Sequence, residues 1–99
     1  MVHGIEIPRD RLKAFCIHNG IRRLALFGSV LRNDFRPESD VDVLVEFQPG
    51  VHVGLAFVRL QEDLSVLLGR RVDLNTPAGL SKYFRGEVLQ EAEEVYVAA

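Results

Sequence analysis

Three aspartates and a Gly-Ser pair are the residues whose types and spacing could do chemistry in this chain. Within the stretch LALFGSVLRNDFRPESDVDVLVEF (residues 24–47), Gly28 and Ser29 follow one apolar run, and Asp40 and Asp42 precede the next. Two carboxylates about 5 Å apart repel each other by roughly 3 kcal/mol at an effective dielectric constant near 20. Water can screen this repulsion, or a cation can remove it, and Mg²⁺ commonly binds carboxylate oxygens together with substrate phosphates. The spacing therefore indicates either solvated turn residues or a cation site.

The third aspartate lies on a later segment of the chain. Asp73 is in the middle of RRVDLN (residues 70–75), between Val72 and Leu74. If this segment is a strand, its two apolar neighbours point to one face and Asp73 points to the other. Asp73 would then join the first two aspartates if this strand lies beside the strand predicted over residues 41–47.

The Gly-Ser pair could hold a phosphate chain. Gly28 ends an apolar strand, and we expect one helical turn from Ser29 to about Asn33. The backbone N–H groups of such a turn and the Ser29 hydroxyl are suitable donors for phosphate oxygens. Other known patterns do not fit, because the chain lacks a GxxxxGK[ST] loop and the ligand spacing of an EF-hand. The Asp-x-Asp also precedes its apolar strand, which disfavours a phosphatase of the haloacid-dehalogenase type.

The hydrophobic pattern predicts the elements that must position these groups. We predict helices over residues 8–19 and 54–68, strands over 22–27, 41–47 and 70–75, and one or two helices from Pro77 to about Val95. In this last segment the apolar residues Leu80, Phe84, Val88, Leu89 and Ala92 are expected to face the core. The order predicts an α/β (α+β) fold in which helices cover a short mixed sheet.

Length and composition indicate a single domain over residues 1–99. Hydrophobic residues make up 47% of the chain and charged residues 26%, as in ordinary globular proteins. The net charge of −2 provides no general basic field for nucleic acid. The single cysteine, Cys16, excludes an internal disulfide and fits a reducing compartment. No signal peptide or membrane span is evident, so we expect a cytoplasmic protein without membrane contact.

The combined pattern resembles the DNA-polymerase-beta-type nucleotidyltransferases. Its parts are the Gly-Ser, about ten intervening residues, the Asp-x-Asp, and the third Asp on a later strand. The short length and the later VDLNTP, LS and VLQEA segments are similar to the minimal nucleotidyltransferases. These are typically encoded beside a HEPN-domain protein, as antitoxins of toxin–antitoxin pairs. The resemblance extends from about Leu24 to Val95, and it departs from the frequent Ala-Arg-Gly at residues 31–33, where only Arg32 is retained.

The resemblance implies a polymerase-beta-like nucleotidyltransferase fold and a magnesium-dependent transfer of AMP from ATP. The catalytic residues would be Asp40, Asp42 and Asp73, which would also hold two Mg²⁺ ions. The nucleotide-binding residues would be Gly28, Ser29, Arg32 and Ser39. Arg32 could instead pair with Asp34 or Glu38, and Ser39 could instead orient the loop that carries Asp40. The implied acceptor is a tyrosine hydroxyl of a HEPN-domain ribonuclease toxin in a hetero-oligomer, without direct contact to nucleic acid.

Two other functions remain open from the sequence. The protein could neutralise its partner by binding alone, since 99 residues leave little room for a separate acceptor-binding domain. It could also transfer a nucleotide to a small molecule such as an aminoglycoside-like alcohol. Such enzymes normally carry an additional helical domain, which this chain lacks.

Overall fold

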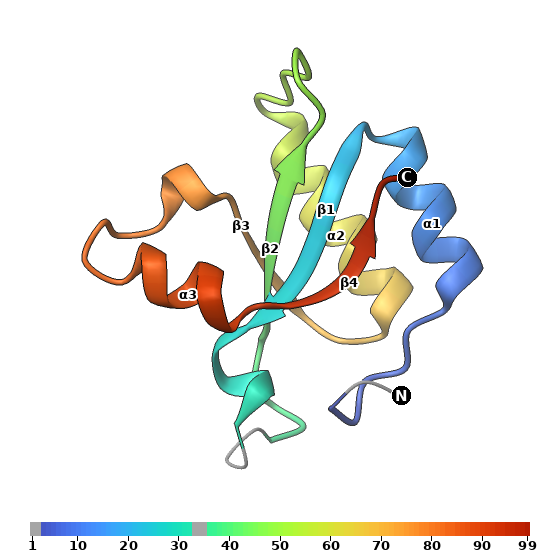
Figure 1. The fold of residues 1–99 in the computed structure, drawn as a ribbon. Helices are drawn as coiled ribbons and strands as arrows, with labels where there is room; N and C mark the ends of the chain where they lie inside the picture. Colours follow the sequence, from blue (N-terminus) through green and yellow to red (C-terminus); the bar gives the residue numbers. More distant parts are fainter. Residues whose placement is uncertain (1–2, 33–35) are drawn as a thin grey trace.

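The computed structural model describes residues 3–32 and 36–99 (Figure 1). Its helices are α1 (Arg9–His18), α2 (Ala56–Leu68) and α3 (Arg85–Glu91), with short 3₁₀ helices η1 (Gly28–Leu31) and η2 (Pro77–Gly79). Its strands are β1 (Ile21–Phe27), β2 (Val41–Phe47), β3 (Val72–Asn75) and β4 (Glu93–Val97). The predicted helical turn after Gly28 is present, although its expected end at Asn33 lies outside the described residues. Within the described ranges, no helix has both the length and the apolar character that crossing a bilayer requires.

The four strands form one mixed sheet in the order β3-β2-β1-β4. β1 runs antiparallel to both β2 and β4, whereas β2 and β3 are parallel. A parallel pair requires a crossover connection, and α2 provides it. Helices α1 and α2 cover one face of the sheet, and α3 lies against the other (Figure 1). The predicted fold of helices on a short mixed sheet is therefore confirmed.

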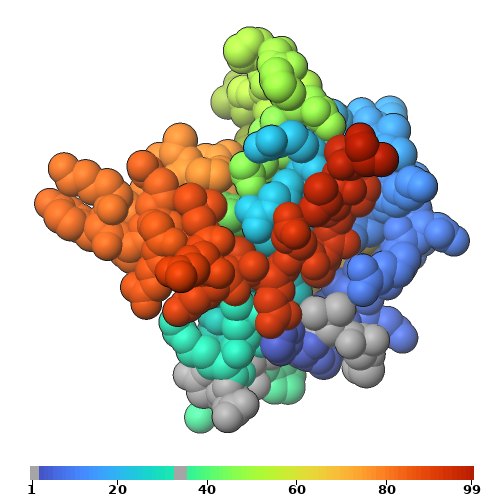
Figure 2. All heavy atoms as spheres, in the orientation of Figure 1, coloured from blue at the N-terminus to red at the C-terminus, as the bar shows by residue number. Residues whose placement is uncertain are grey.

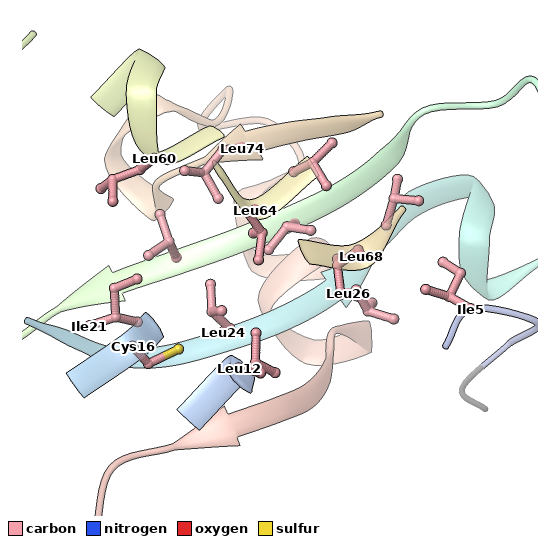
Figure 3. Close-up of a cluster of buried hydrophobic side chains, with 14 of the residues drawn as sticks. Ile5, Leu12, Cys16, Ile21, Leu24, Leu26, Leu60, Leu64, Leu68 and Leu74 are labelled. Carbon is pink, nitrogen blue, oxygen red and sulfur yellow. The ribbon is translucent and has the colours of Figure 1, made fainter. Parts of the chain in front are cut away.

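The main core lies between the sheet and the helices α1 and α2. Leu64 of α2 is 1% exposed, and Cys16 of α1 is fully buried. Figure 3 shows how leucines from both helices meet the side chains of β1 and β3. The alternation of Val41, Val43 and Val45 brings all three side chains of β2 to this face, as its two-residue period predicts.

A smaller core lies on the opposite face, beneath α3. It consists of Ala25, Phe27, Leu44 and Leu80, with Val88 and Ala92 packed against it. The prediction that Leu80, Val88 and Ala92 face inward is confirmed. The same prediction is wrong for Phe84 and Leu89, which are 47% and 37% exposed. Phe84 precedes α3, and Leu89 lies on a helix of only seven residues that packs on the sheet through Val88.

The C-terminal segment forms a strand where the sequence predicted helix. Helix α3 ends at Glu91, and β4 then pairs with β1 along an edge of the sheet. Arg23 of β1 binds the carboxylate of Glu94 at 2.6 Å, and the amide of Ala98 donates to the carbonyl of Arg22 at 2.8 Å. These partners come from a distant part of the chain, so the local pattern of EEVYV does not reveal them.

Candidate active site

Three of the predicted site residues lie close together where β1 ends. The register places Phe27 of β1 opposite Asp42 of β2, and Asp42 beside Asp73 of β3. Gly28, the residue that follows Phe27, is therefore adjacent to the Asp42 side chain. The strands that carry Asp42 and Asp73 are neighbours, as expected, and the Gly-Ser turn lies beside them.

Asp42 is a partly buried carboxylate in a cluster of negative charge. Its pKa is raised from 3.8 to about 6, chiefly because burial removes water from the charged form. The charges of Asp73 and Asp40 and a side-chain hydrogen bond with Asp73 raise the pKa further, whereas Arg32 opposes the shift. Two carboxyl groups can share a hydrogen bond only when one is protonated. The site therefore favours the uptake of a proton or of a cation.

Asp40 lies at the rim of this cluster. Its side chain is 48% exposed, and its Oδ1 accepts a contact of 3.0 Å from Nε of Arg71. Exposed ion pairs of this kind contribute about 0–1 kcal/mol, so a ligand can displace Arg71 at little cost. In the part of the chain that the structure describes, no three His, Cys, Asp or Glu side chains form a group that could enclose a metal ion. The convergence of all three aspartates on metal stays a prediction.

The carboxylates nevertheless fit Mg²⁺ by their chemistry. Mg²⁺ is usually held by one or two carboxylates together with substrate phosphates, rather than by a closed cage of protein ligands. Asp42 and Asp73 are two such carboxylates on adjacent strands. The raised pKa of Asp42 means that its charged form lacks sufficient stabilisation in the metal-free protein. A divalent cation bound there would supply that stabilisation.

The turn at Gly28 is closed against Asp42. Gly28 has φ +73°, a conformation that residues with a Cβ rarely adopt. A Cβ at this position would overlap Oδ2 of Asp42 and lie 3.2 Å from its Cγ. Ser29 follows in η1 and remains partly exposed, while Val30 anchors the turn in the main core. Glycine thus allows the backbone of the turn to approach the carboxylates closely.

Arg70 holds the loop that leads to Asp40. Its Nη2 donates to the carbonyl oxygens of Arg36 and Pro37 at 3.1 Å and of Ser39 at 3.3 Å. The Ser39 hydroxyl accepts a hydrogen bond from the Arg36 amide within the same loop at 3.3 Å. Ser39 thus has the contacts of a residue that orients the loop. The role of Arg70 was not predicted, because its carbonyl partners carry no signature in the sequence.

Arg32 is exposed at the end of η1. Its charge lowers the pKa of Asp42, which indicates that its guanidinium lies close to the carboxylates. The alternative partner Asp34 is outside the described residues, and no ion pair with Glu38 is present in the described part. The predicted role of Arg32 in nucleotide binding therefore stays a prediction.

A pocket of about 250 Å³ opens beside the Gly-Ser turn. Phe27, Gly28 and Arg32 form one wall, and the second wall consists of Phe84 and residues of α3. A larger hollow of about 880 Å³ lies between α1 and α2. That hollow is on the opposite side of the sheet from Asp42, so it is separate from the carboxylates.

Comparison with known proteins decides the family. Residues 9–95 match the nucleotidyltransferase domain family. The chain belongs to the nucleotidyltransferases. It is 41% identical over 78 residues to the protein adenylyltransferase MntA of Thermococcus cleftensis, covering 79% of this chain and 76% of that protein. It is 37% identical over 90 residues to MJ0435 of Methanocaldococcus jannaschii, a candidate protein adenylyltransferase, covering 91% and 95%.

Solved structures share the fold of this nucleotidyltransferase. One structure, described as a candidate minimal nucleotidyltransferase, superposes with a TM-score of 0.68 at 40% identity over 85% of each chain. A toxin–antitoxin complex with AMP-PNP superposes with a TM-score of 0.70 at 19% identity, over 92% of this chain and 74% of that one. At that identity the second match supports the fold alone. The predicted family, its fold and its class of enzyme are confirmed.

The contacts of Arg70 with the loop that leads to Asp40 give a first prediction. We expect Arg70→Met to weaken metal binding about tenfold, a loss of about 1.4 kcal/mol, because Asp40 loses its fixed position while the aliphatic stem is kept. The dissociation constant of Mn²⁺ would be measured by calorimetry. Arg71→Met is the matched control, because it removes a contact to Asp40 without touching the loop carbonyls and should not weaken binding. Equal Mn²⁺ affinity in Arg70→Met and wild type would contradict the positioning role.

Proposed function

We propose that this nucleotidyltransferase transfers AMP from ATP to a tyrosine hydroxyl group of a HEPN-domain partner. It thereby acts as the antitoxin of that partner. The observation that carries the proposal is the adjacency of Asp42 and Asp73 beside the tight turn at Gly28. Relatives named as protein adenylyltransferases support the reaction. Two toxin–antitoxin complexes share the fold and support the kind of partner: one of MntA with HepT, and one of an MNT antitoxin with a tri-AMPylated HEPN toxin.

Different residues bind the phosphates, hold the metal and accept the proton in the proposed reaction. The backbone amides of the Gly28–Ser29 turn and the Ser29 hydroxyl bind the phosphate chain of ATP. Asp42 and Asp73, assisted by Asp40, would hold Mg²⁺, which neutralises charge on the phosphate oxygens and lowers the pKa of an acceptor hydroxyl. Asp73, the exposed member of the adjacent pair, accepts the hydroxyl proton. The acceptor oxygen bonds to the α-phosphorus, and the bond to the bridging oxygen breaks, so pyrophosphate leaves with the electron pair.

The proposal includes a cytoplasmic hetero-oligomer. The single thiol, Cys16, is buried, and burial raises its pKa to about 12, so it remains a protonated core residue. Such a residue needs no oxidising compartment. The partner would bind on the solvent-exposed side of Asp73 on β3, because the acceptor hydroxyl must reach this carboxylate.

The proposal is tested with labelled ATP, Mg²⁺ and a HEPN-domain protein, the proposed partner. We expect label on the partner with wild type and none with the Asp40→Ala/Asp42→Ala variant, while the complex still forms. Absence of transfer by wild type in an intact complex would contradict the proposal. Full protection of cells by the folded double variant would instead support neutralisation by binding alone. Transfer to small alcohols but never to protein would indicate a small-molecule enzyme.

A further inference from the structure

The pocket between the Gly-Ser turn and α3 is lined by two aromatic side chains. Its buried side is Phe27, which is 8% exposed, and its outer side is Phe84, which is 47% exposed. Val88 of α3 also lines it. Pockets for drug-sized ligands are roughly 300–1,000 Å³, so about 250 Å³ suits one part of a nucleotide rather than the whole molecule. In Figure 2 the segment of α3 lies directly beside that of η1 on this face.

The pocket is continuous with the proposed phosphate site. Gly28 lines the pocket and also abuts the Asp42 carboxylate. Arg32 lines the pocket and also lowers the pKa of Asp42. A nucleotide whose phosphates lie at the turn can therefore place another of its groups in the pocket. The aromatic walls favour the base, because stacking on aromatic side chains is a general means of binding bases.

Two glutamates of α3 add negative charge to the lining of the pocket. Glu87 and Glu91 are four residues apart, so they share one face of the helix, and both line the pocket. Within the described residues, neither side chain has a hydrogen-bonding or ion-pair partner. An ionised carboxylate only accepts hydrogen bonds. The pair therefore favours a base edge with amino donors and disfavours one with a carbonyl oxygen at the same place.

We propose that this pocket binds the adenine of ATP, with Phe84 stacking on the ring and Glu87 and Glu91 accepting hydrogen bonds from its 6-amino group. This inference rests on the proposed function and adds the source of its base preference. Guanine carries a carbonyl oxygen at position 6, which would face the two carboxylates. Sites that hydrogen-bond one group of a ligand disfavour analogues that lack that group.

The stacking role is tested by equilibrium binding without acceptor protein. The probes are α,β-methylene-ATP and inorganic tripolyphosphate, each titrated in the presence of Mg²⁺. We expect Phe84→Ala to weaken the ATP analogue about tenfold or more and to leave tripolyphosphate unchanged. Phe84→Leu keeps an apolar side chain without an aromatic face and should behave likewise. Tyr83→Ala is the matched control, because Tyr83 is the neighbouring aromatic residue, 88% exposed and outside the pocket.

The selectivity role is tested with three bases on the wild-type protein and the Glu87→Gln/Glu91→Gln variant. Wild type should bind α,β-methylene-ATP about tenfold or more tightly than purine riboside triphosphate, which lacks the amino group, and than α,β-methylene-GTP. The variant should lose most of this preference, since an amide can donate to the guanine oxygen. Glu62→Gln on α2 is the control for a change of charge outside the pocket.

Four results separate the outcomes. Unchanged affinity of Phe84→Ala and Phe84→Leu for the ATP analogue would overturn the base pocket. Equal wild-type affinity for the three bases would overturn the amino-group recognition. If the Phe84 and Glu87/Glu91 variants bind nucleotide like wild type but no longer bind the partner protein, the pocket belongs to the partner interface and the proposal is overturned. Absence of binding of both tripolyphosphate and the ATP analogue to wild type would instead remove the proposed function, and this inference with it.

Discussion

Asp42→Asn is expected to abolish AMP transfer and at the same time to stabilise the metal-free protein. Loss of a carboxylate that holds the cation should lower the transfer rate by roughly 1,000-fold or more, since metal assistance amounts to several kcal/mol. Stability should rise by about 1–2 kcal/mol at neutral pH, after allowance for solvent screening, because the partly buried charge disappears. The two effects are measured by label transfer and by urea unfolding in EDTA. Asp63→Asn, on the exposed side of α2, is the matched control.

The same variant should change how stability depends on pH. The folded-state pKa of Asp42 is raised from 3.8 to about 6, so the folded protein holds this proton more tightly than the unfolded chain. The resulting stabilisation is fully present below about pH 4 and is lost as the pH rises through about 6. Wild type should therefore lose about 1 kcal/mol relative to Asp42→Asn between about pH 5 and 7.5. Parallel stability curves for the two proteins would contradict the electrostatic account of the site.

Gly28→Ala is expected to lower transfer by about 100-fold or more, because the new methyl group must displace the Asp42 carboxylate. The positive φ adds about 1 kcal/mol of backbone strain. Gly50→Ala separates these two causes, since Gly50 has φ +84° with nothing within 4 Å of an added Cβ. It should lose similar stability through strain and keep full activity. Transfer and Mn²⁺ affinity in Gly28→Ala equal to wild type would show that close contact between turn and carboxylate is unnecessary.

The local pattern of the chain was sufficient for most elements. The valine alternation in β2 predicted both its bounds and its buried face, and helices α1 and α2 and strands β1 and β3 begin and end within two residues of expectation. These elements each bury one regular face against the main core, so their periodicity is visible in sequence. Strand β4 is different, because its partner β1 lies about seventy residues away in the chain and its own glutamates face solvent.

For the candidate site, the sequence by itself determined the residue types: a Gly-Ser turn, an Asp-x-Asp and a third Asp on the solvent side of a later strand. Their catalytic roles stay predictions. Only the tertiary structure decided that Asp73 lies beside Asp42, that Gly28 touches the same carboxylate, and that Arg70 holds the Asp40 loop. It also decided that α3 faces the turn across a pocket. The physical reason is that strand register and carbonyl contacts depend on packing between distant segments, whereas residue chemistry is local.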